Sequence, residues 1–267
     1  MPPVDLYDST YGHFHEDVLA LVRAETYGTD IGQSGWTTVE EYGEFIEWLG
    51  LAGPHHALDV GCGSGGPALH LARLTGARVT GIDINADGIA TAARQAADGG
   101  LAEQATFRVV DVDAALPFDA DSFDAIISMD AMCHMPLRPH VLEEWRRVLK
   151  PGGRAVFTDP VVVTGPVSSV EIAVRSSIGR FLFVPPGANE QFIVRAGLRL
   201  VRAADLSVQG AGMARRWHAA RASRREALIA LEGEERFAGL QAFLDVVQRV
   251  MGERRLSRIA YFVDRPA

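Results

Sequence analysis

A glycine-rich segment is the strongest chemical signal in this sequence. It runs from Leu58 to Pro67 and passes from an apolar stretch into closely spaced glycines, then into a proline suited to the first turn of a helix. Gly61, Gly63 and Gly66 match the spacing of dinucleotide-binding loops, in which backbone approaches a ligand closely. Asp83 lies about where an acid would meet a ribose hydroxyl. A nicotinamide-dependent dehydrogenase and a purely structural turn are both compatible with this segment alone.

The elements around this segment indicate an α/β fold. From residue 57 onward, short β-branched runs alternate with Ala-rich helical stretches, which is typical of a parallel sheet with helices on both faces. Strands are expected at residues 57–60, 78–82, 105–110, 123–128 and 153–158. Helices are expected at 13–25, 38–49, 66–74, 86–98 and 138–148. The last of these helices should end before Pro151, because proline cannot continue a helix.

The regular alternation breaks after the fifth predicted strand. Residues 160–190 contain Gly165-Pro166 and Pro185-Pro186-Gly187, too many breakers for a plain crossover, and we interpret them as an insertion. Beyond it we expect a strand at 199–206, helices at 212–231 and 233–252, and a last strand at 258–264. The interpretation is one domain, with a helical cap at 1–52, a cofactor-binding core at 53–160, and lid insertions with the final strands at 161–267.

Composition and charge narrow the class of partner. The chain is 48% hydrophobic and 22% charged, as expected of a globular protein. Its net charge of −8 repels polyphosphate and disfavours a nucleic-acid partner, so a small molecule is expected. The chain has two cysteines, no secretory signal and no apolar run near the roughly 20 residues that span a bilayer. We therefore expect a cytoplasmic protein without membrane spans or metal sites, whereas its oligomeric state is not indicated.

A series of motifs resembles the class I S-adenosylmethionine-dependent methyltransferases, most closely the small-molecule, type 11-like group. The resemblance covers roughly residues 57–160. It rests on Leu58 to Gly65, Gly81-Ile82-Asp83-Ile84, Phe107 to Asp111, Leu116-Pro117-Phe118, Ser122-Phe123-Asp124 and Trp145 to Gly153. The family implies a Rossmann-like seven-stranded sheet, mostly parallel with an antiparallel last strand and helices on both faces. About 50 largely helical residues separate the last two strands here, which suits a helical lid over the substrate.

The resemblance also implies residues that bind S-adenosylmethionine. Asp59 would order the glycine loop, Asp83 would accept hydrogen bonds from both ribose hydroxyls, and Ile84 would pack on the adenine. Asp111 would meet the adenine amino group, although the spacing to Leu116 leaves Asp113 as an alternative. Further cofactor contacts are expected at Gly61, Gly63, Val112, Met129 and Gln33, with Tyr7, Tyr11, Tyr27 and Trp36 closing over the cofactor or serving as core.

Methyl transfer to a hydroxyl also requires a base, and His134 is the candidate. It follows the strand predicted at 123–128, while Asp159 follows the strand at 153–158, so both belong to the ligand-binding edge of the sheet. Our hypothesis is an O-methyltransferase in which His134 is the general base and Asp159 orients it or binds a substrate hydroxyl. A carbon or nitrogen methyltransferase in which His134 only shapes the pocket is the alternative. A catalytically silent cofactor-binding protein is also compatible with the sequence.

Overall fold

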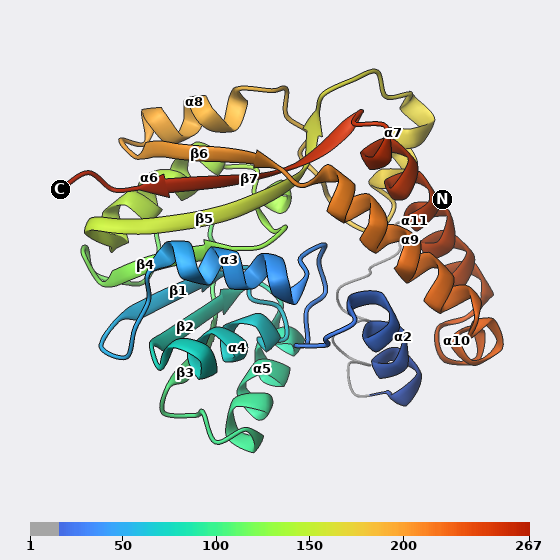
Figure 1. The fold of residues 1–267 in the computed structure, drawn as a ribbon, viewed down its shortest axis with the longest axis horizontal. Coiled ribbons are helices and arrows are strands. Elements are labelled where there is room, and N and C mark those ends of the chain that lie inside the picture. The colour runs from blue at the N-terminus through green and yellow to red at the C-terminus, as the bar shows by residue number, and fades with distance from the viewer. Residues whose placement is uncertain (1–15) are drawn as a thin grey trace.

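A seven-stranded sheet forms the centre of the molecule (Figure 1). The computed structural model describes residues 16–267. The strand order is β3-β2-β1-β4-β5-β7-β6, in which β7 runs antiparallel to both of its neighbours. The strands are β1 (His56–Val60), β2 (Arg78–Asp83), β3 (Ala105–Val109), β4 (Phe123–Ser128), β5 (Leu149–Val163), β6 (Arg199–Asp205) and β7 (Leu256–Asp264). This arrangement confirms the predicted fold class.

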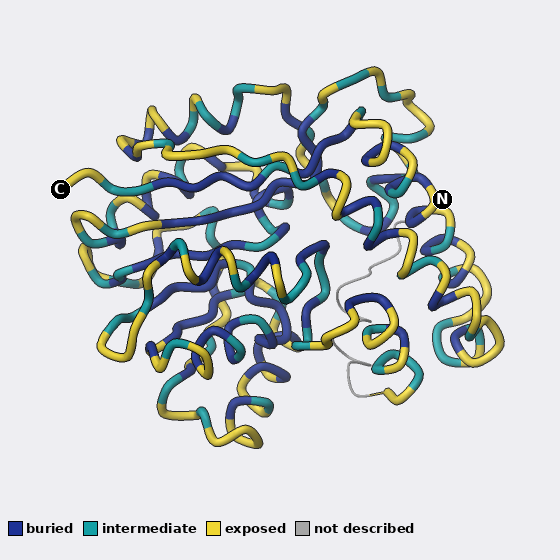
Figure 2. The backbone as a smooth tube through the Cα atoms, viewed as in Figure 1, coloured by how far each residue is buried: buried dark blue, intermediate teal, exposed yellow. Residues whose placement is uncertain are grey.

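Helices connect the strands and cover both faces of the sheet. They are α2 (Asp17–Tyr27), α3 (Val39–Leu49), α4 (Gly66–Thr75), α5 (Ala86–Asp98), α6 (Arg138–Val148), α7 (Ser169–Arg175), α8 (Ala188–Arg195), α9 (Ser207–Ala222), α10 (Arg225–Glu232) and α11 (Glu234–Gly252). One apolar core packs α3 and α4 on the sheet, and a second packs α6 and α8 on the opposite face. The central strands are accordingly the most deeply buried part of the backbone (Figure 2).

Two glycines allow the loop after β1 to take its close-packed form. Gly61 has a φ of 76°, and a Cβ on it would collide with Ala131. Gly66 begins α4, where a Cβ would collide with the backbone carbonyl of Ile31. Gly61 therefore lets the segment after β4 approach the loop, and Gly66 lets the segment before α3 approach the start of α4.

A helical layer lies beyond the carboxyl ends of the parallel strands, where α2, α9, α10 and α11 gather (Figure 1). A separate apolar core holds this layer to the segment before α3, through residues that include Tyr27, Trp36, Ile178, Met213, Leu240 and Phe243. The layer therefore covers the edge of the sheet at which ligands bind in open α/β folds. No helix in residues 16–267 is long and apolar enough to cross a membrane.

The second half of the chain departs from the predicted boundaries. The insertion after β5 contains two short helices, α7 and α8, which the density of Gly and Pro did not predict. The helix predicted at 212–231 is two helices, α9 and α10, interrupted at Ser223 and Arg224. Strand β5 begins at Leu149, directly after α6 ends, rather than at residue 153. Part of the helix predicted at 13–25 lies outside the described residues.

Candidate active site

A cavity of about 690 Å³ lies between the carboxyl ends of the strands and the helical layer. It is large enough for a cofactor and a small acceptor, since ligand pockets typically have volumes of about 300–1,000 Å³. Seven of the predicted site residues line it: Gly61, Asp83, Ile84, Asp111, Val112, Met129 and His134. They follow β1, β2, β3 and β4, so the fold brings together residues that are far apart in the sequence.

Asp83 is fixed at the end of β2 by backbone groups on both sides. Gly63 N donates to its Oδ2 at 2.9 Å, and Asn85 N donates to its Oδ1 at 2.8 Å. Burial raises the pKa of this carboxyl, whereas backbone hydrogen bonds from Asn85, Gly63 and Ile84 lower it. The hydrogen bond from Gly63 explains how this glycine contributes to the site, because it orients the carboxylate.

A second, smaller cavity of about 40 Å³ adjoins the first and shares Gly61 and Met129 with it. Asp59 and Gln33 line this smaller cavity. Burial, reinforced by the charge of Asp83, raises the pKa of Asp59 to about 7. The Gln33 side chain is tied to its own segment, because Ile31 N donates to its Oε1 at 2.8 Å and its Nε2 donates to the Thr29 carbonyl at 3.1 Å.

Asp111 and Asp113 both line the large cavity. Asp113 N donates to Asp111 Oδ1 at 3.0 Å, and Leu137 N donates to Asp113 Oδ1 at 3.3 Å. One oxygen of each carboxylate therefore organises the loop after β3. Asp111 remains the predicted partner of the adenine amino group, with Asp113 as the alternative.

His134 ends a short 3₁₀ turn after β4 and faces the cavity. Its Nδ1 lies 2.6 Å from the carbonyl oxygen of Arg180, and its ring centroid lies 4.5 Å from that of Phe181. A carbonyl only accepts hydrogen bonds, so Nδ1 carries the proton and the lone pair of the neutral ring is on Nε2. Burial lowers the pKa of His134 to about 4, helped by the nearby charges of Arg175 and Arg138.

The predicted pairing of Asp159 with His134 is wrong in this structure. Asp159 is fully buried in β5 and does not line the cavity. Its Oδ2 accepts from Arg138 Nη1 at 2.7 Å and from Asn189 Nδ2 at 2.9 Å, and its Oδ1 accepts from Val161 N at 3.1 Å. The carboxylate therefore holds the guanidinium of Arg138, which in turn donates to the Leu182 carbonyl at 2.7 Å. These contacts connect Asp159 to the segment that contains Leu182, which follows the cavity residues Arg180 and Phe181.

We expect Asp159→Asn to lower the free energy of unfolding by about 3–5 kcal/mol, because it leaves the buried Arg138 charge without its carboxylate. Urea denaturation measures the change. Asp264→Asn is a matched control, since it breaks a pair whose arginine, Arg199, is mostly exposed, and should cost less than about 1 kcal/mol. Equal losses in the two variants would contradict a structural role for Asp159.

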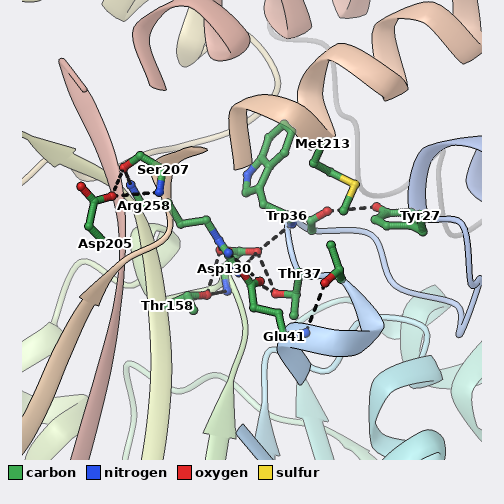
Figure 3. Close-up of polar contacts among 12 residues, drawn as sticks. Tyr27, Trp36, Thr37, Glu41, Asp130, Thr158, Asp205, Ser207, Met213 and Arg258 are labelled. Atoms are coloured by element: carbon green, nitrogen blue, oxygen red, sulfur yellow. Dashed lines mark hydrogen bonds and ion pairs between the residues drawn. The ribbon is translucent and has the colours of Figure 1, made fainter. Parts of the chain in front are cut away.

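A buried ion-pair network, not anticipated from the sequence, links the end of β4 to β7 and α3 (Figure 3). Arg258 Nε donates to Asp130 Oδ1 at 2.8 Å, and its Nη1 donates to Glu41 Oε2 at 2.8 Å. Asp130 also accepts from Trp36 N at 2.7 Å and from Thr158 Oγ1 at 2.8 Å. The network therefore holds the segment before α3 against the cavity, where Trp36 forms part of the wall.

Asp130 has a left-handed backbone, with a φ of 55°. Asp is one of the few residues besides glycine that tolerate this conformation. Asp130 lies two residues after β4, at the edge of the sheet where ligands bind, and this position is the signal that could have identified it. Of the aromatic residues predicted to close the site, Tyr27 is buried and donates to the Gly35 carbonyl at 3.0 Å, while Tyr7 and Tyr11 lie outside the described residues.

Comparisons with known proteins identify the enzyme family to which this chain belongs. Residues 58–157 match the model of a methyltransferase domain. Methyltransferase GfsG from Streptomyces halstedii is 33% identical over 222 residues, which cover 77% of this chain and 78% of that protein. The chain belongs to the class I S-adenosylmethionine-dependent methyltransferases. The dehydrogenase interpretation of the glycine loop is therefore excluded.

One further relative and one solved structure extend the comparison of this methyltransferase. The 27-O-demethylrifamycin SV methyltransferase of Amycolatopsis mediterranei is 29% identical over 200 residues, covering 74% of this chain and 68% of that protein. The solved structure of a putative sarcosine dimethylglycine methyltransferase from Galdieria sulphuraria aligns with a TM-score of 0.78 at 22% identity, covering 85% of this chain and 84% of that one. The latter likeness concerns the fold alone.

The residues present fit S-adenosylmethionine, the cofactor of this family. The loop at Gly61 leaves no room for a side chain, and the carboxylate of Asp83 is held rigidly at the neighbouring strand end. Asp83, Asp111 and Asp113 line the cavity near the ends of β2 and β3, and their negative charge suits a cofactor with a positively charged sulfonium. The methyltransferase thus combines a glycine-containing loop, a carboxylate at a strand end and a histidine in one cavity.

Proposed function

We propose that this enzyme transfers a methyl group from S-adenosylmethionine to a hydroxyl of a small organic acceptor, with His134 as the general base. The observation that carries the proposal is the position of His134, on the wall of the cavity that the cofactor-end residues also line. Its hydrogen bond to the Arg180 carbonyl directs the basic nitrogen, Nε2, away from the Arg180 backbone.

The electrostatics of His134 keep its ring unprotonated. With a pKa near 4, the ring is neutral throughout the physiological range and has a free acceptor nitrogen, although the low pKa makes it a weaker base than an ordinary histidine. The Arg180 carbonyl stabilises the charged ring that forms when the proton arrives, since hydrogen bonding to a charged form favours that form. Burial has the opposite effect and promotes return of the proton to solvent after the reaction.

Methyl transfer to a hydroxyl requires the protein mainly to align the two reactants and to remove one proton. S-adenosylmethionine supplies, when bound, a methyl group on a sulfonium sulfur that leaves as a neutral thioether. His134 Nε2 takes the hydroxyl proton while the acceptor oxygen forms its bond to the methyl carbon and the carbon–sulfur bond breaks. Apolar walls that include Trp36, Ile178 and Phe243 exclude water from this displacement.

The acceptor class is supported by both the cavity and the relatives. A mostly apolar wall fits a small organic molecule, as pockets for such ligands are lined mainly by hydrophobic and aromatic side chains. The name of the Amycolatopsis relative describes an O-demethylated rifamycin as its substrate, which favours an oxygen acceptor here. Transfer to carbon or nitrogen is the alternative outcome of the tests that follow.

The test is His134→Asn, which keeps a side-chain amide able to donate to the Arg180 carbonyl. We expect kcat to fall at least about 100-fold, since a positioned base contributes roughly 10²–10⁴ to the rate. Cofactor affinity, measured by calorimetry, should stay unchanged. His140→Asn is the matched control, because His140 does not line the cavity. Unchanged turnover in the His134 variant would remove this residue from the mechanism and favour a carbon or nitrogen acceptor.

The pH profile gives a second test of the same role. Protonation blocks the base, so activity is lost as pH falls through the pKa of His134, which lies near 4. We therefore expect kcat/KM of the wild-type enzyme to be level between about pH 6 and 8, not to fall near the ordinary histidine value of about 6.5. A decline centred near 6.5 that disappears in His134→Asn would show that the ring titrates normally.

A further inference from the structure

A short segment after α7 contacts the imidazole of His134 and the backbone next to it. The carbonyl oxygen of Arg180 lies 2.6 Å from His134 Nδ1, and the ring centroid of Phe181 lies 4.5 Å from that of the imidazole. Leu182 N donates to the carbonyl of Cys133, the residue before His134, at 2.8 Å. The position of this segment therefore determines which hydrogen bond the imidazole makes.

The segment has little regular structure of its own. Residues 176–187, all within the described part of the chain, connect α7 to α8 without forming a helix or a strand, and a single bridge joins Val184 to Val162 of β5. Such a connection is held in place by individual hydrogen bonds and not by a continuous ladder. The groups that bind the chain next to Arg180 therefore have a direct effect on where its carbonyl lies.

Arg138 holds this segment from inside the protein. It begins α6 and is almost fully buried, and its Nη2 donates to the carbonyl of Leu182 at 2.7 Å. Its Nη1 donates to Asp159 Oδ2 at 2.7 Å and to Asn189 Oδ1 at 3.0 Å. Because the guanidinium is planar and rigid, the two acceptors of Nη1 also set the direction of Nη2. Leu182 is thus held through its N–H by Cys133 and through its carbonyl by Arg138.

The Arg180 carbonyl selects one tautomer of His134. A carbonyl only accepts, so this contact is made when the proton is on Nδ1, which leaves the lone pair on Nε2. If the carbonyl moved away, water could donate to Nδ1 or accept from it, and both neutral tautomers would be populated. An imidazole with its proton on Nε2 cannot accept a second proton there, so the tautomer matters for a general base.

We propose that Arg138 is a positioning residue that fixes the tautomer of His134, by holding in place the segment whose Arg180 carbonyl binds Nδ1. Asp159 and Asn189 contribute by orienting the guanidinium. The consequence for methyl transfer rests on the proposed function, whereas the tautomer is a property of the enzyme before cofactor or acceptor binds. Arg138 does not line the cavity, so it acts on the site through this segment and not by contact with a ligand.

The experiment records the imidazole nitrogens by NMR in enzyme labelled with ¹⁵N-histidine, without ligands, at pH 7.5. The chain has eight histidines, and His134→Asn identifies the signals of His134 by their loss. With a pKa near 4 the ring is neutral at this pH, so its two nitrogen resonances report the tautomer alone. In the wild type we expect them far apart, with the proton on Nδ1. A wild-type His134 with its proton on Nε2 would overturn the proposal.

Two variants separate positioning from stability. The double variant Arg138→Met/Asp159→Asn removes both buried charges and the hydrogen bond to Leu182, so the two resonances of His134 should move toward each other as both tautomers become populated. Asp159→Asn alone lowers stability, because it leaves a buried charge unpaired, but it keeps Arg138 Nη2 on Leu182 and should keep the wild-type resonances. If the double variant retained the proton on Nδ1, or Asp159→Asn lost it to the same extent, Arg138 would have no positioning role.

Arg147→Met is the matched control, since Arg147 lies on the same helix and donates to the carbonyls of Leu116 and Phe118, outside the cavity. It should leave the His134 resonances unchanged, and a shift as large as that of the double variant would contradict the role of Arg138. The measurement uses neither cofactor nor acceptor. Unchanged turnover in His134→Asn would therefore end the proposed function and leave the tautomer result intact, so the two failures are distinguishable.

Discussion

Replacement of Asp83 by Ala lowers the affinity for S-adenosylmethionine at least about 100-fold, which corresponds to two lost hydrogen bonds to a charged acceptor. The carboxylate lies at the end of β2, oriented by Gly63 N and Asn85 N, and faces the cavity. A cofactor ribose offers two adjacent hydroxyls, which match the two oxygens of one carboxylate. Calorimetric titration of the purified variant measures the loss directly.

The Asp83 prediction has two informative controls. Asp83→Asn keeps the shape and one acceptor oxygen and should lose less affinity than Asp83→Ala. Asp87→Ala makes the same chemical change at an exposed position in the first turn of α5, outside the cavity, and should bind like the wild type. If Asp83→Ala retained wild-type affinity, the ribose assignment would be incorrect, and an acid of the β3 loop would take its place.

Replacement of Arg258 by Met should produce a large loss of stability. It leaves Asp130 and Glu41 buried without their shared cation, and breaking a buried pair in this way costs about 3–5 kcal/mol. Urea denaturation at pH 7 measures the loss. Arg202→Met is a matched control on the neighbouring strand, because Arg202 is exposed and packs over Phe262. A loss from Arg258→Met no larger than the control loss would contradict the role of the network.

The pH dependence of this variant has a defined sign. Burial already raises the pKa of Glu41 against the attraction of Arg258, and removal of that attraction raises it further. A carboxyl whose folded pKa lies above its unfolded value favours the folded state at low pH and disfavours it as pH rises. The stability difference between wild type and Arg258→Met should therefore shrink as pH falls from 7 towards 5.

The glycine loop and the strand ends were accessible to prediction because their signals are local. Strands β1, β2 and β4 were predicted to within a residue or two, since apolar runs bounded by glycine and acidic residues mark strands buried on both faces. Asp83 and His134 could be placed in one site because the carboxyl ends of parallel strands meet at one edge. These inferences needed only the topology of the sheet.

The rest of the site depends on contacts that no local pattern encodes. Asp159 follows its predicted strand just as Asp83 does, but its carboxylate is paired with Arg138 of α6. Arg175 lies in an insertion dense with breakers, and only the fold brings Phe243 of α11 against it. The break between α9 and α10 falls at Ser223 and Arg224, where neither Pro nor Gly marks it. Each feature is set by tertiary packing, which overrides local preference.

The order of the strands has a consequence for the synthesis of this enzyme. Strand β7 is the last of the seven to be translated, yet it lies between β5 and β6. Glu41 and its partner Arg258 are 217 residues apart, so at about 5–20 residues per second the cation follows the carboxylate by roughly 10–40 s. Until then, the backbone N–H and C=O groups on one edge of β5 have no partner strand. Such an exposed strand edge can pair with another chain and cause aggregation. The sheet is therefore completed only when its last strand has been translated.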